Sequence, residues 1–174
     1  MRHRLALVVV PVLALLALPA APAVAAAPPN DAFASPATLT SEAPALAGDN
    51  LRATSEPSET ESSGYAKLDD CATFTSAPDC GNTVWYAFTA PATTNYTVET
   101  CDKGTEVDTV LYAYTGAALG ALAEVAKNDD DCDGGYGGNG SRITIAATAG
   151  TTYRLQIDGY NAAQGTFYLR AYPA

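Results

Sequence analysis

Residues 84–89 read VWYAFT, and Pro91 follows shortly after them. Strongly and weakly apolar side chains alternate in this segment, and a proline cannot continue the hydrogen-bonding ladder of a sheet. The segment therefore predicts a β-strand with two differently buried faces. Similar alternation or short apolar runs predict further strands at 37–39, 46–53, 96–101, 109–114, 125–126, 142–146, 153–158 and 166–170.

Glycine-rich turns separate these segments, and the stretches between them lack the period of an amphipathic helix. Many short strands joined by such turns are typical of an antiparallel sandwich or barrel. A domain usually has about 100–200 residues, so residues 26–174 are predicted to form one domain. The strand pattern predicts that this domain is all-β. A polar stretch at residues 55–82 is predicted to be a long loop.

The first 25 residues predict a secretory signal peptide. Arg2 and Arg4 precede an apolar run at residues 5–18, and residues 23–25 read AVA, the small-residue pattern of a cleavage site. Cleavage after Ala25 leaves 149 residues. The whole chain carries 9 basic and 19 acidic side chains, so the loss of two arginines changes the net charge from −10 to −12.

Charge and residue types exclude several classes of function. The one histidine, His3, lies in the predicted signal, which leaves no histidine for a catalytic triad or a metal site. Nucleic acid phosphates repel a strongly negative domain. No later run of about 18 apolar residues could anchor the chain in a membrane. We expect a secreted, extracellular and monomeric domain.

The sequence also argues against catalysis. The serines lack a base, so a carboxylate pair like that of glycoside hydrolases is the remaining route. Nothing in the sequence places a glutamate in the apolar pocket that a general acid needs. We expect a protein that is not an enzyme. The glutamates considered are Glu56, Glu59, Glu61, Glu99 and Glu124.

The four cysteines are Cys71, Cys80, Cys101 and Cys132. An even number of cysteines in an exported chain predicts disulfides, and their spacing matches no zinc motif. Four cysteines allow three ways of pairing. Sequence order favours bonds between Cys71 and Cys80 and between Cys101 and Cys132.

Acidic side chains are densest at residues 128–134, which read NDDDCDG. Carboxylates crowded in this way repel one another unless a cation or solvent offsets their charge. Calcium takes about six to eight oxygen ligands in flexible geometry, so the candidate ligands are Asp129, Asp130, Asp131 and Asp133. The segment matches the first half of an EF-hand loop, but Gly140 stands where the closing glutamate should be. The alternative is a solvated acidic loop.

A second acidic group, Asp102, Glu106 and Asp108, follows Cys101. The Cβ atoms of a disulfide lie about 4 Å apart, so a bond between Cys101 and Cys132 would bring the two acidic segments together. Asp108 therefore joins the candidate calcium ligands. In the alternative, the disulfide only joins the ends of two strands.

Ten tyrosines and one tryptophan suggest a different kind of binding site. Exposed aromatic rings stack on sugars or contact peptides. Trp85 lies in a predicted strand, where we expect its ring to be buried in the core or packed on a sheet face. Tyr136 and Tyr160 lie in predicted loops, so they are the candidate contacts of a carbohydrate- or matrix-protein-binding module that needs no metal.

Several short motifs follow one another in an order typical of one bacterial family. They read PNDAF at 29–33, VWYAFTAP at 84–91, DTVLYAYTG at 108–116, NDD at 128–130, SRI at 141–143, AGTTY at 149–153 and DGY at 158–160. In this order the motifs resemble the bacterial pre-peptidase C-terminal domain family, over about residues 29–172.

The resemblance implies a jelly-roll-like β-sandwich that bacteria export, usually as a non-catalytic accessory domain of secreted proteases. Some relatives bind calcium between an N-terminal Asn-Asp pair and an acidic loop. Here that arrangement implies Asn30 and Asp31 as ligands beside Asp129 and Asp130. The two residues before Asn30 are prolines, where those relatives carry glutamates.

The resemblance also implies the pairing of Cys101 with Cys132, because cysteines at these two loops recur in the family. It leaves Cys71 and Cys80 as a local addition. Some relatives bind substrates such as collagen. We therefore expect a secreted accessory or binding module that disulfides and a structural calcium ion stabilise, with an extracellular protein or polysaccharide as its partner.

Overall fold

The computed structural model describes residues 26–59, 82–132 and 139–174. Their regular structure consists of β-strands and two short 3-10 helices, Leu119–Ala121 and Tyr160–Ala162. Neither helix of these described ranges has the length or the apolar character needed to cross a lipid bilayer. The strands are β1 (Ala37–Leu39), β2 (Leu46–Asp49), β3 (Val84–Thr89), β4 (Thr94–Glu99), β5 (Thr109–Thr115), β6 (Ala123–Asp129), β7 (Arg142–Ala147), β8 (Thr152–Gly159) and β9 (Thr166–Pro173).

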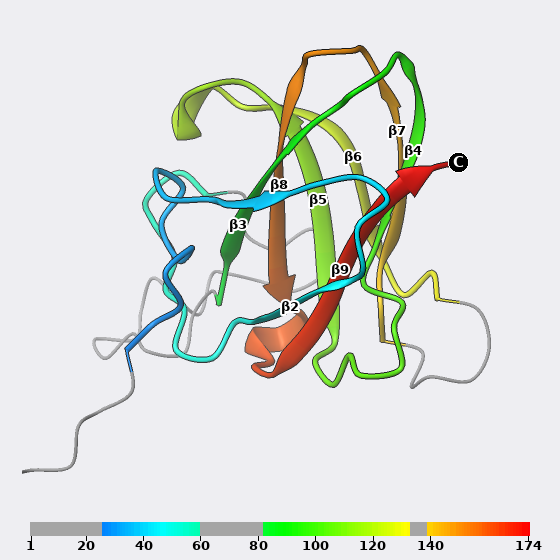
Figure 1. The fold of residues 1–174 in the computed structure, drawn as a ribbon. Helices are drawn as coiled ribbons and strands as arrows, with labels where there is room; N and C mark the ends of the chain where they lie inside the picture. The colour runs from blue at the N-terminus through cyan, green and yellow to red at the C-terminus, as the bar shows by residue number, and fades with distance from the viewer. Residues whose placement is uncertain (1–25, 60–81, 133–138) are drawn as a thin grey trace, which may run out of the picture.

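Two β-sheets face each other and form a sandwich (Figure 1). One sheet has the strand order β1-β3-β8-β5-β6, and the other has the order β2-β9-β4-β7. Neighbouring strands are antiparallel, except that β1 is parallel to β3. Successive strands alternate between the two sheets, except that β5 and β6 are consecutive and pair with each other in the five-stranded sheet. The predicted all-β, jelly-roll-like sandwich is confirmed.

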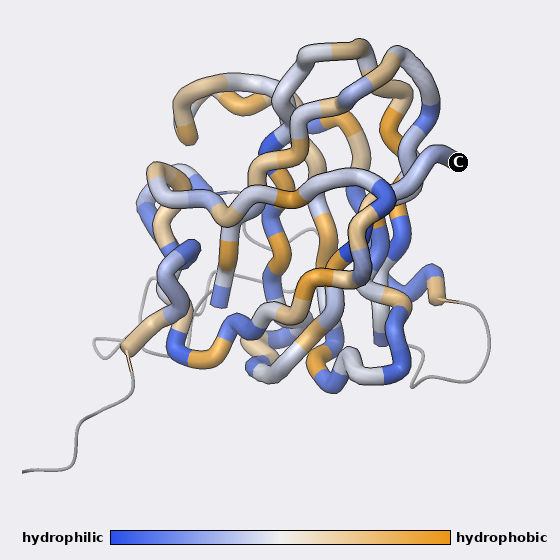
Figure 2. Tube along the Cα trace, in the orientation of Figure 1, coloured by the Kyte–Doolittle hydropathy of each residue, from blue (hydrophilic) through white to orange (hydrophobic). Residues whose placement is uncertain are grey.

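The core fills the space between the two sheets, because alternate side chains of each strand point inward. Across β3 and β8, Val84 pairs with Ile157 and Tyr86 pairs with Leu155, and all four side chains are buried. Figure 2 shows hydrophobic and hydrophilic residues alternating along the strands. The four-stranded sheet contributes Tyr96, Val98, Ile143, Ile145, Phe167, Leu169 and Ala171 to the same core.

A second apolar cluster lies on the outer face of the five-stranded sheet and consists of Phe33, Trp85, Val110, Tyr112 and Tyr114. All five side chains are buried. Phe33 meets Trp85 edge-on, with 5.0 Å between ring centroids, and the rings of Tyr112 and Tyr114 stack at 5.9 Å. The N-terminal segment therefore covers part of this face through Phe33, and the expected burial of Trp85 is confirmed.

Each predicted strand corresponds to an observed one, but the bounds differ most at β2 and β6. The prediction at 46–53 is too long, because β2 ends at Asp49. At β6 the apolar pattern predicts two residues, but the strand has seven, and its side chains are largely exposed. An edge strand with one exposed face needs few apolar residues, and only Val125 stands out in the sequence. The observed strand includes Asn128 and Asp129, so the acidic segment begins inside β6.

Candidate metal centre

Three aspartates meet where β6 ends beside the start of β5. Asp108 directly precedes β5, and Asp129 is the last residue of β6, where it pairs with Val110. Antiparallel pairing places these two positions at the same end of the sheet. Asp130 follows with a left-handed backbone (φ 63°), which aspartate adopts more readily than most residues. Asp108, Asp129 and Asp130 each offer a carboxylate oxygen within 4.8 Å of the others.

Two carboxylate oxygens of this group have no hydrogen-bond partner among the residues that the structure describes. Oδ1 of Asp108 and Oδ1 of Asp129 are buried, and no donor within the described residues reaches them. Burial, together with the charges of Asp130 and Asp108, raises the pKa of Asp129 to about 6. Burial and the charge of Asp130 also raise the pKa of Asp108. The cluster therefore concentrates negative charge that water solvates only in part.

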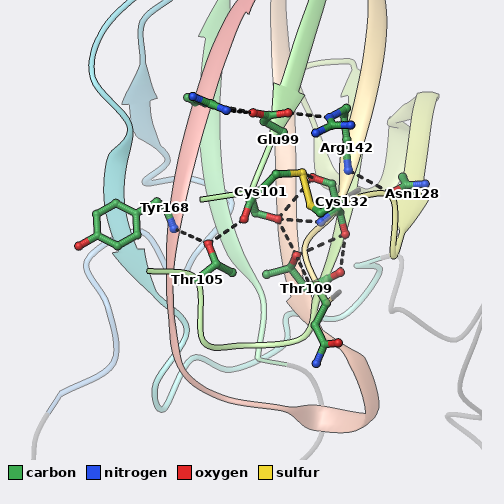
Figure 3. The surroundings of a disulfide bond; sticks show 12 residues. Glu99, Cys101, Thr105, Thr109, Asn128, Cys132, Arg142 and Tyr168 are labelled. Carbon is green, nitrogen blue, oxygen red and sulfur yellow. Dashed lines mark hydrogen bonds and ion pairs between the residues drawn. A yellow bond between two sulfur atoms is a disulfide. The ribbon is translucent and has the colours of Figure 1, made fainter. Parts of the chain in front are cut away.

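A disulfide between Cys101 and Cys132 ties the segment after β6 to the end of β4 (Figure 3). The two Cα atoms are 5.3 Å apart. Gly140 packs against the sulfur of Cys132, and any side chain at this position would overlap that sulfur. The carbonyl of Gly140 accepts the N–H of Asp131 at 3.1 Å. The predicted pairing is confirmed, and it holds the residues that directly follow the aspartates.

Buried hydroxyl groups join the neighbouring strand ends. Thr100 Oγ1 and Thr109 Oγ1 lie 2.7 Å apart, and the N–H of Ser141 donates to Thr100 Oγ1 at 2.9 Å. All three residues are fully buried. On β6, Asn128 Oδ1 accepts the N–H of Arg142 at 3.0 Å. The ends of β4 and β6 and the starts of β5 and β7 are thus held together, and Asp108 and Asp129 lie on this rigid base.

The aspartate cluster has the donor set of a hard cation. Calcium binds carboxylate and carbonyl oxygens at about 2.3–2.6 Å and accepts irregular geometry. Asp108, Asp129 and Asp130 would hold such an ion through their carboxylates, and the buried Oδ1 atoms of the first two fit that role because they have no other described partner. The chemistry that a bound ion supplies here is charge neutralisation.

A family model described as the bacterial pre-peptidase C-terminal domain matches residues 82–173, more than half of the chain. The chain belongs to this family. A pre-peptidase C-terminal domain is a non-catalytic domain of peptidases, and such domains occur in secreted bacterial proteases.

Among solved structures, the chain is similar to the pre-peptidase C-terminal domain of a collagenase from Bacillus anthracis, whose crystal structure was determined at 1.0 Å. The two chains share 12% sequence identity. The comparison covers 78% of this chain and 92% of the collagenase domain, with a TM-score of 0.44. No curated protein matches the chain.

In this pre-peptidase C-terminal domain, Asn30 and Asp31 do not join the aspartate cluster. Asn30 is buried beside β3, where its side-chain amide donates to the carbonyl of Trp85 at 3.1 Å and its own carbonyl accepts the N–H of Trp85 at 2.9 Å. Two further strands, β8 and β5, separate β3 from β6. The structure therefore does not bring the N-terminal pair to Asp129, and the expected single site is split into two separate groups.

The N-terminal group includes glutamates that sequence reasoning did not place there. The carboxylate of Asp31 accepts the N–H of Thr54 at 2.6 Å and its hydroxyl at 3.0 Å. Glu56 accepts the N–H of Phe33 at 2.6 Å. These carboxylates bind protein donors, so they fasten residues 54–59 to the N-terminal segment of the domain.

Glu59 belongs to the same group and is almost fully buried. It accepts hydrogen bonds from Trp85 Nε1 at 2.7 Å, from the Thr83 hydroxyl at 2.5 Å and from the N–H of Glu56 at 3.0 Å. Burial raises the pKa of Glu59, although the hydrogen bonds from Thr83 and Trp85 oppose the change. No local pattern in the sequence signals this contact, because it joins segments that are far apart in the chain.

The remaining predicted residues of the pre-peptidase C-terminal domain lie apart from the cluster or outside the described ranges. Asp131 is exposed and is not among the three grouped aspartates. Tyr160 is half-buried against the outer apolar cluster, so much of its ring is already in contact with the protein. The residues that lie outside the described ranges are Cys71, Cys80, Asp133 and Tyr136.

Glu99 on β4 forms a charged contact that the sequence does not predict. Its carboxylate is fully buried and accepts hydrogen bonds at 2.6 Å from Nε of Arg142 and at 2.6 Å from Nε of Arg170 (Figure 3). Burial by itself would raise the pKa of Glu99, but the two guanidinium groups outweigh burial and lower it. Both arginines are direct cross-strand partners of Glu99, so the contact depends on the register of β4 with β7 and β9.

Proposed function

We propose that this domain is a secreted, non-catalytic binding module in which a calcium ion at Asp108, Asp129 and Asp130 stabilises the end of β6. The observation that supports calcium is the pair of buried Oδ1 atoms on Asp108 and Asp129, which have no partner in the described part of the chain. A buried acceptor without a partner costs about 1–3 kcal/mol. A divalent cation would satisfy both acceptors and offset the repulsion among the three carboxylates.

The non-catalytic part of the proposal is supported by the family, whose domains are non-catalytic parts of peptidases. The chemistry of the described residues agrees with it. Glu59 accepts hydrogen bonds from Thr83 and Trp85, and Glu99 is bound by two arginines, so both buried glutamates stabilise the fold. We infer that the partner is an extracellular protein or polysaccharide.

Calcium binding is tested by thermal unfolding in millimolar calcium and in chelator. A ligand that binds only the folded state raises the melting temperature, here by about 5–10 °C at saturating calcium. Asp108→Asn and Asp129→Asn should each remove this increase. Glu124→Gln alters an exposed carboxylate on the same strand and should retain it. Identical melting of the unmodified protein in calcium and in chelator would overturn the calcium part of the proposal.

Secretion is tested separately by expressing the full chain in a bacterial host and analysing the culture medium. Mass spectrometry should find a mature protein that begins at Ala26. Retention of residues 1–25 on a protein that stays inside the cell would overturn this part.

A further inference from the structure

The outer face of the four-stranded sheet carries a groove where β2 and β9 meet the loop between β4 and β5. Its volume is about 440 Å³, and its lining includes Gly48, Asp49, Gly104, Glu106, Thr166 and Tyr168. Thr166 and Tyr168 are alternate residues of β9, and Asp49 is the cross-strand partner of Thr166. Paired strands therefore form the groove together with one loop.

The tyrosine of this groove is held in place without a ligand. Gly104 packs directly against the ring of Tyr168, and a side chain at position 104 would overlap that ring. The N–H of Tyr168 donates to Thr105 Oγ1 at 3.2 Å, and Thr105 Oγ1 donates to the carbonyl of Thr100 at 2.7 Å (Figure 3). The ring is thus preorganised as one wall of the groove.

Each of the two carboxylates in the groove accepts a hydrogen bond through only one of its oxygens. Asp49 Oδ1 accepts the N–H of Leu51 at 3.1 Å, and Glu106 Oε2 accepts the hydroxyl of Thr166 at 3.0 Å. Within the described ranges, no donor contacts the second oxygen of either carboxylate, and no lysine or arginine lines the groove. The groove therefore presents two negative charges with free acceptor atoms.

These groups match a positively charged side chain. Carboxylates form strong, charge-assisted hydrogen bonds with ammonium and guanidinium groups, and a tyrosine ring attracts a cation within about 6 Å. The net charge of −10 adds a field that attracts positive partners. Leu46 and Leu51 flank the groove residues of β2 along the chain and are 37% and 45% exposed, which offers apolar surface to the rest of a peptide. A neutral sugar would leave the charge of Asp49 and Glu106 unbalanced.

We propose that this groove binds a lysine or arginine side chain of a partner protein. Asp49 and Glu106 bind the charged end, and Tyr168 contacts the aliphatic stem. The inference rests on the proposed role as a binding module, and it adds the residues and the chemistry of the partner.

The test is isothermal titration calorimetry at low salt with the exported protein and three probes: a lysine-containing hexapeptide, a glutamate-containing hexapeptide and a neutral hexasaccharide. We expect only the lysine peptide to bind. The double variant Asp49→Asn, Glu106→Gln keeps the hydrogen bonds to Leu51 and Thr166 but removes the charge, and it should weaken binding about tenfold or more. Glu42→Gln, an exposed carboxylate that does not line the groove, should change affinity less than about twofold.

Several outcomes would overturn the inference: unchanged affinity in the double variant, binding of the glutamate peptide or the hexasaccharide in place of the lysine peptide, or no binding of any probe. Calcium-dependent melting of the same samples separates this site from the calcium proposal. If calcium still stabilises a protein that binds no lysine peptide, only the groove assignment fails. If the peptide binds and calcium has no effect, only the calcium part fails.

Discussion

The indole nitrogen of Trp85 donates a hydrogen bond to Glu59 across 2.7 Å. Trp85 lies on β3, and Glu59 ends the described segment that follows β2. The bond therefore fastens a polar segment to the outer face of the five-stranded sheet, where Phe33 also packs on the indole. Two parts of the chain before residue 60 thus meet at the single tryptophan of the protein.

Replacing Glu59 should lower the stability of the domain. Glu59→Ala removes the acceptor of the Trp85 indole N–H and of the Glu56 N–H, whereas the hydroxyl of Thr83 can still donate to the carbonyl of Thr54. The free energy of unfolding should therefore fall by about 2–4 kcal/mol. Glu59→Gln keeps the acceptor of the Trp85 indole N–H but places an NH2 group where the second oxygen accepts the N–H of Glu56. It should therefore lose less than Glu59→Ala, about 1–2 kcal/mol. Urea unfolding followed by the fluorescence of Trp85 measures both. Equal losses in the two variants would contradict the role of the hydrogen bonds.

Asp129→Asn should stabilise the calcium-free protein. Burial and neighbouring charges raise the pKa of Asp129 to about 6, so folding disfavours its carboxylate. Stability that is present below about pH 4 is then lost as the pH rises through about 6. The amide does not titrate, so the variant should gain about 1–2 kcal/mol at pH 7, allowing for partial solvent screening.

The measurement for Asp129→Asn is urea unfolding in chelator between pH 4 and pH 7. The variant should lose less stability than the unmodified protein over this range. Glu124→Gln, on the exposed side of the same strand, should follow the unmodified protein. Parallel curves for Asp129→Asn and the unmodified protein would contradict the prediction.

Glu99 should have the opposite pH dependence. Although burial opposes ionisation, Arg142 and Arg170 lower the pKa of Glu99 below its ordinary 4.5. Its contribution is present at neutral pH and is lost as the pH falls through this lowered pKa. Glu99→Gln should flatten the acid limb and cost about 2–3 kcal/mol at pH 7, less than for a fully buried pair because the arginine side chains are 33% and 44% exposed.

Denaturant unfolding from pH 3 to pH 7 checks this prediction. Glu42→Gln removes an exposed carboxylate and should leave the acid limb unchanged. If Glu99→Gln destabilises the protein by the same amount at pH 3 as at pH 7, ionisation of Glu99 does not contribute to the stability of the fold.

The disulfide should stabilise both the fold and the aspartate cluster. Cys101 and Cys132 are 31 positions apart, and closing a loop of this length contributes about 3–4 kcal/mol in the chain-entropy account. The double variant Cys101→Ser, Cys132→Ser should lose about that amount and should bind calcium more weakly, because Asp130 lies two residues from Cys132. Full calcium affinity in this variant would mean that the strands alone position the aspartates.

Most of the sandwich could be predicted, because apolar and polar residues alternate visibly along its strands. In β8, Tyr153, Leu155 and Ile157 show the inward face directly. The seven-residue extent of β6 could not be predicted, because an exposed edge strand requires few apolar side chains. The parallel pairing of β1 with β3 was also hidden, since three residues carry no information about direction.

The candidate metal site could also be predicted only in part. The acidic run at 128–131 indicates Asp129 and Asp130, but the approach of Asp108 depends on the register in which Val110 pairs with Asp129. The groove at Gly104 and Tyr168 joins a loop to a strand more than sixty positions later. Contacts of this kind arise from packing between distant segments, which no local pattern records.

The segment that contains β1 and β2 pairs with both sheets. β1 pairs with β3, Ser41 bridges to Ala171, and β2 pairs with β9. Without this segment, β3 and β9 would each present a row of unpaired backbone donors and acceptors beside aromatic residues of the interior. Open rows of this kind recruit other chains. A fragment trimmed to residues 82–173 should therefore self-associate, and a shortened protein intended to stay monomeric has to keep residues 37–49.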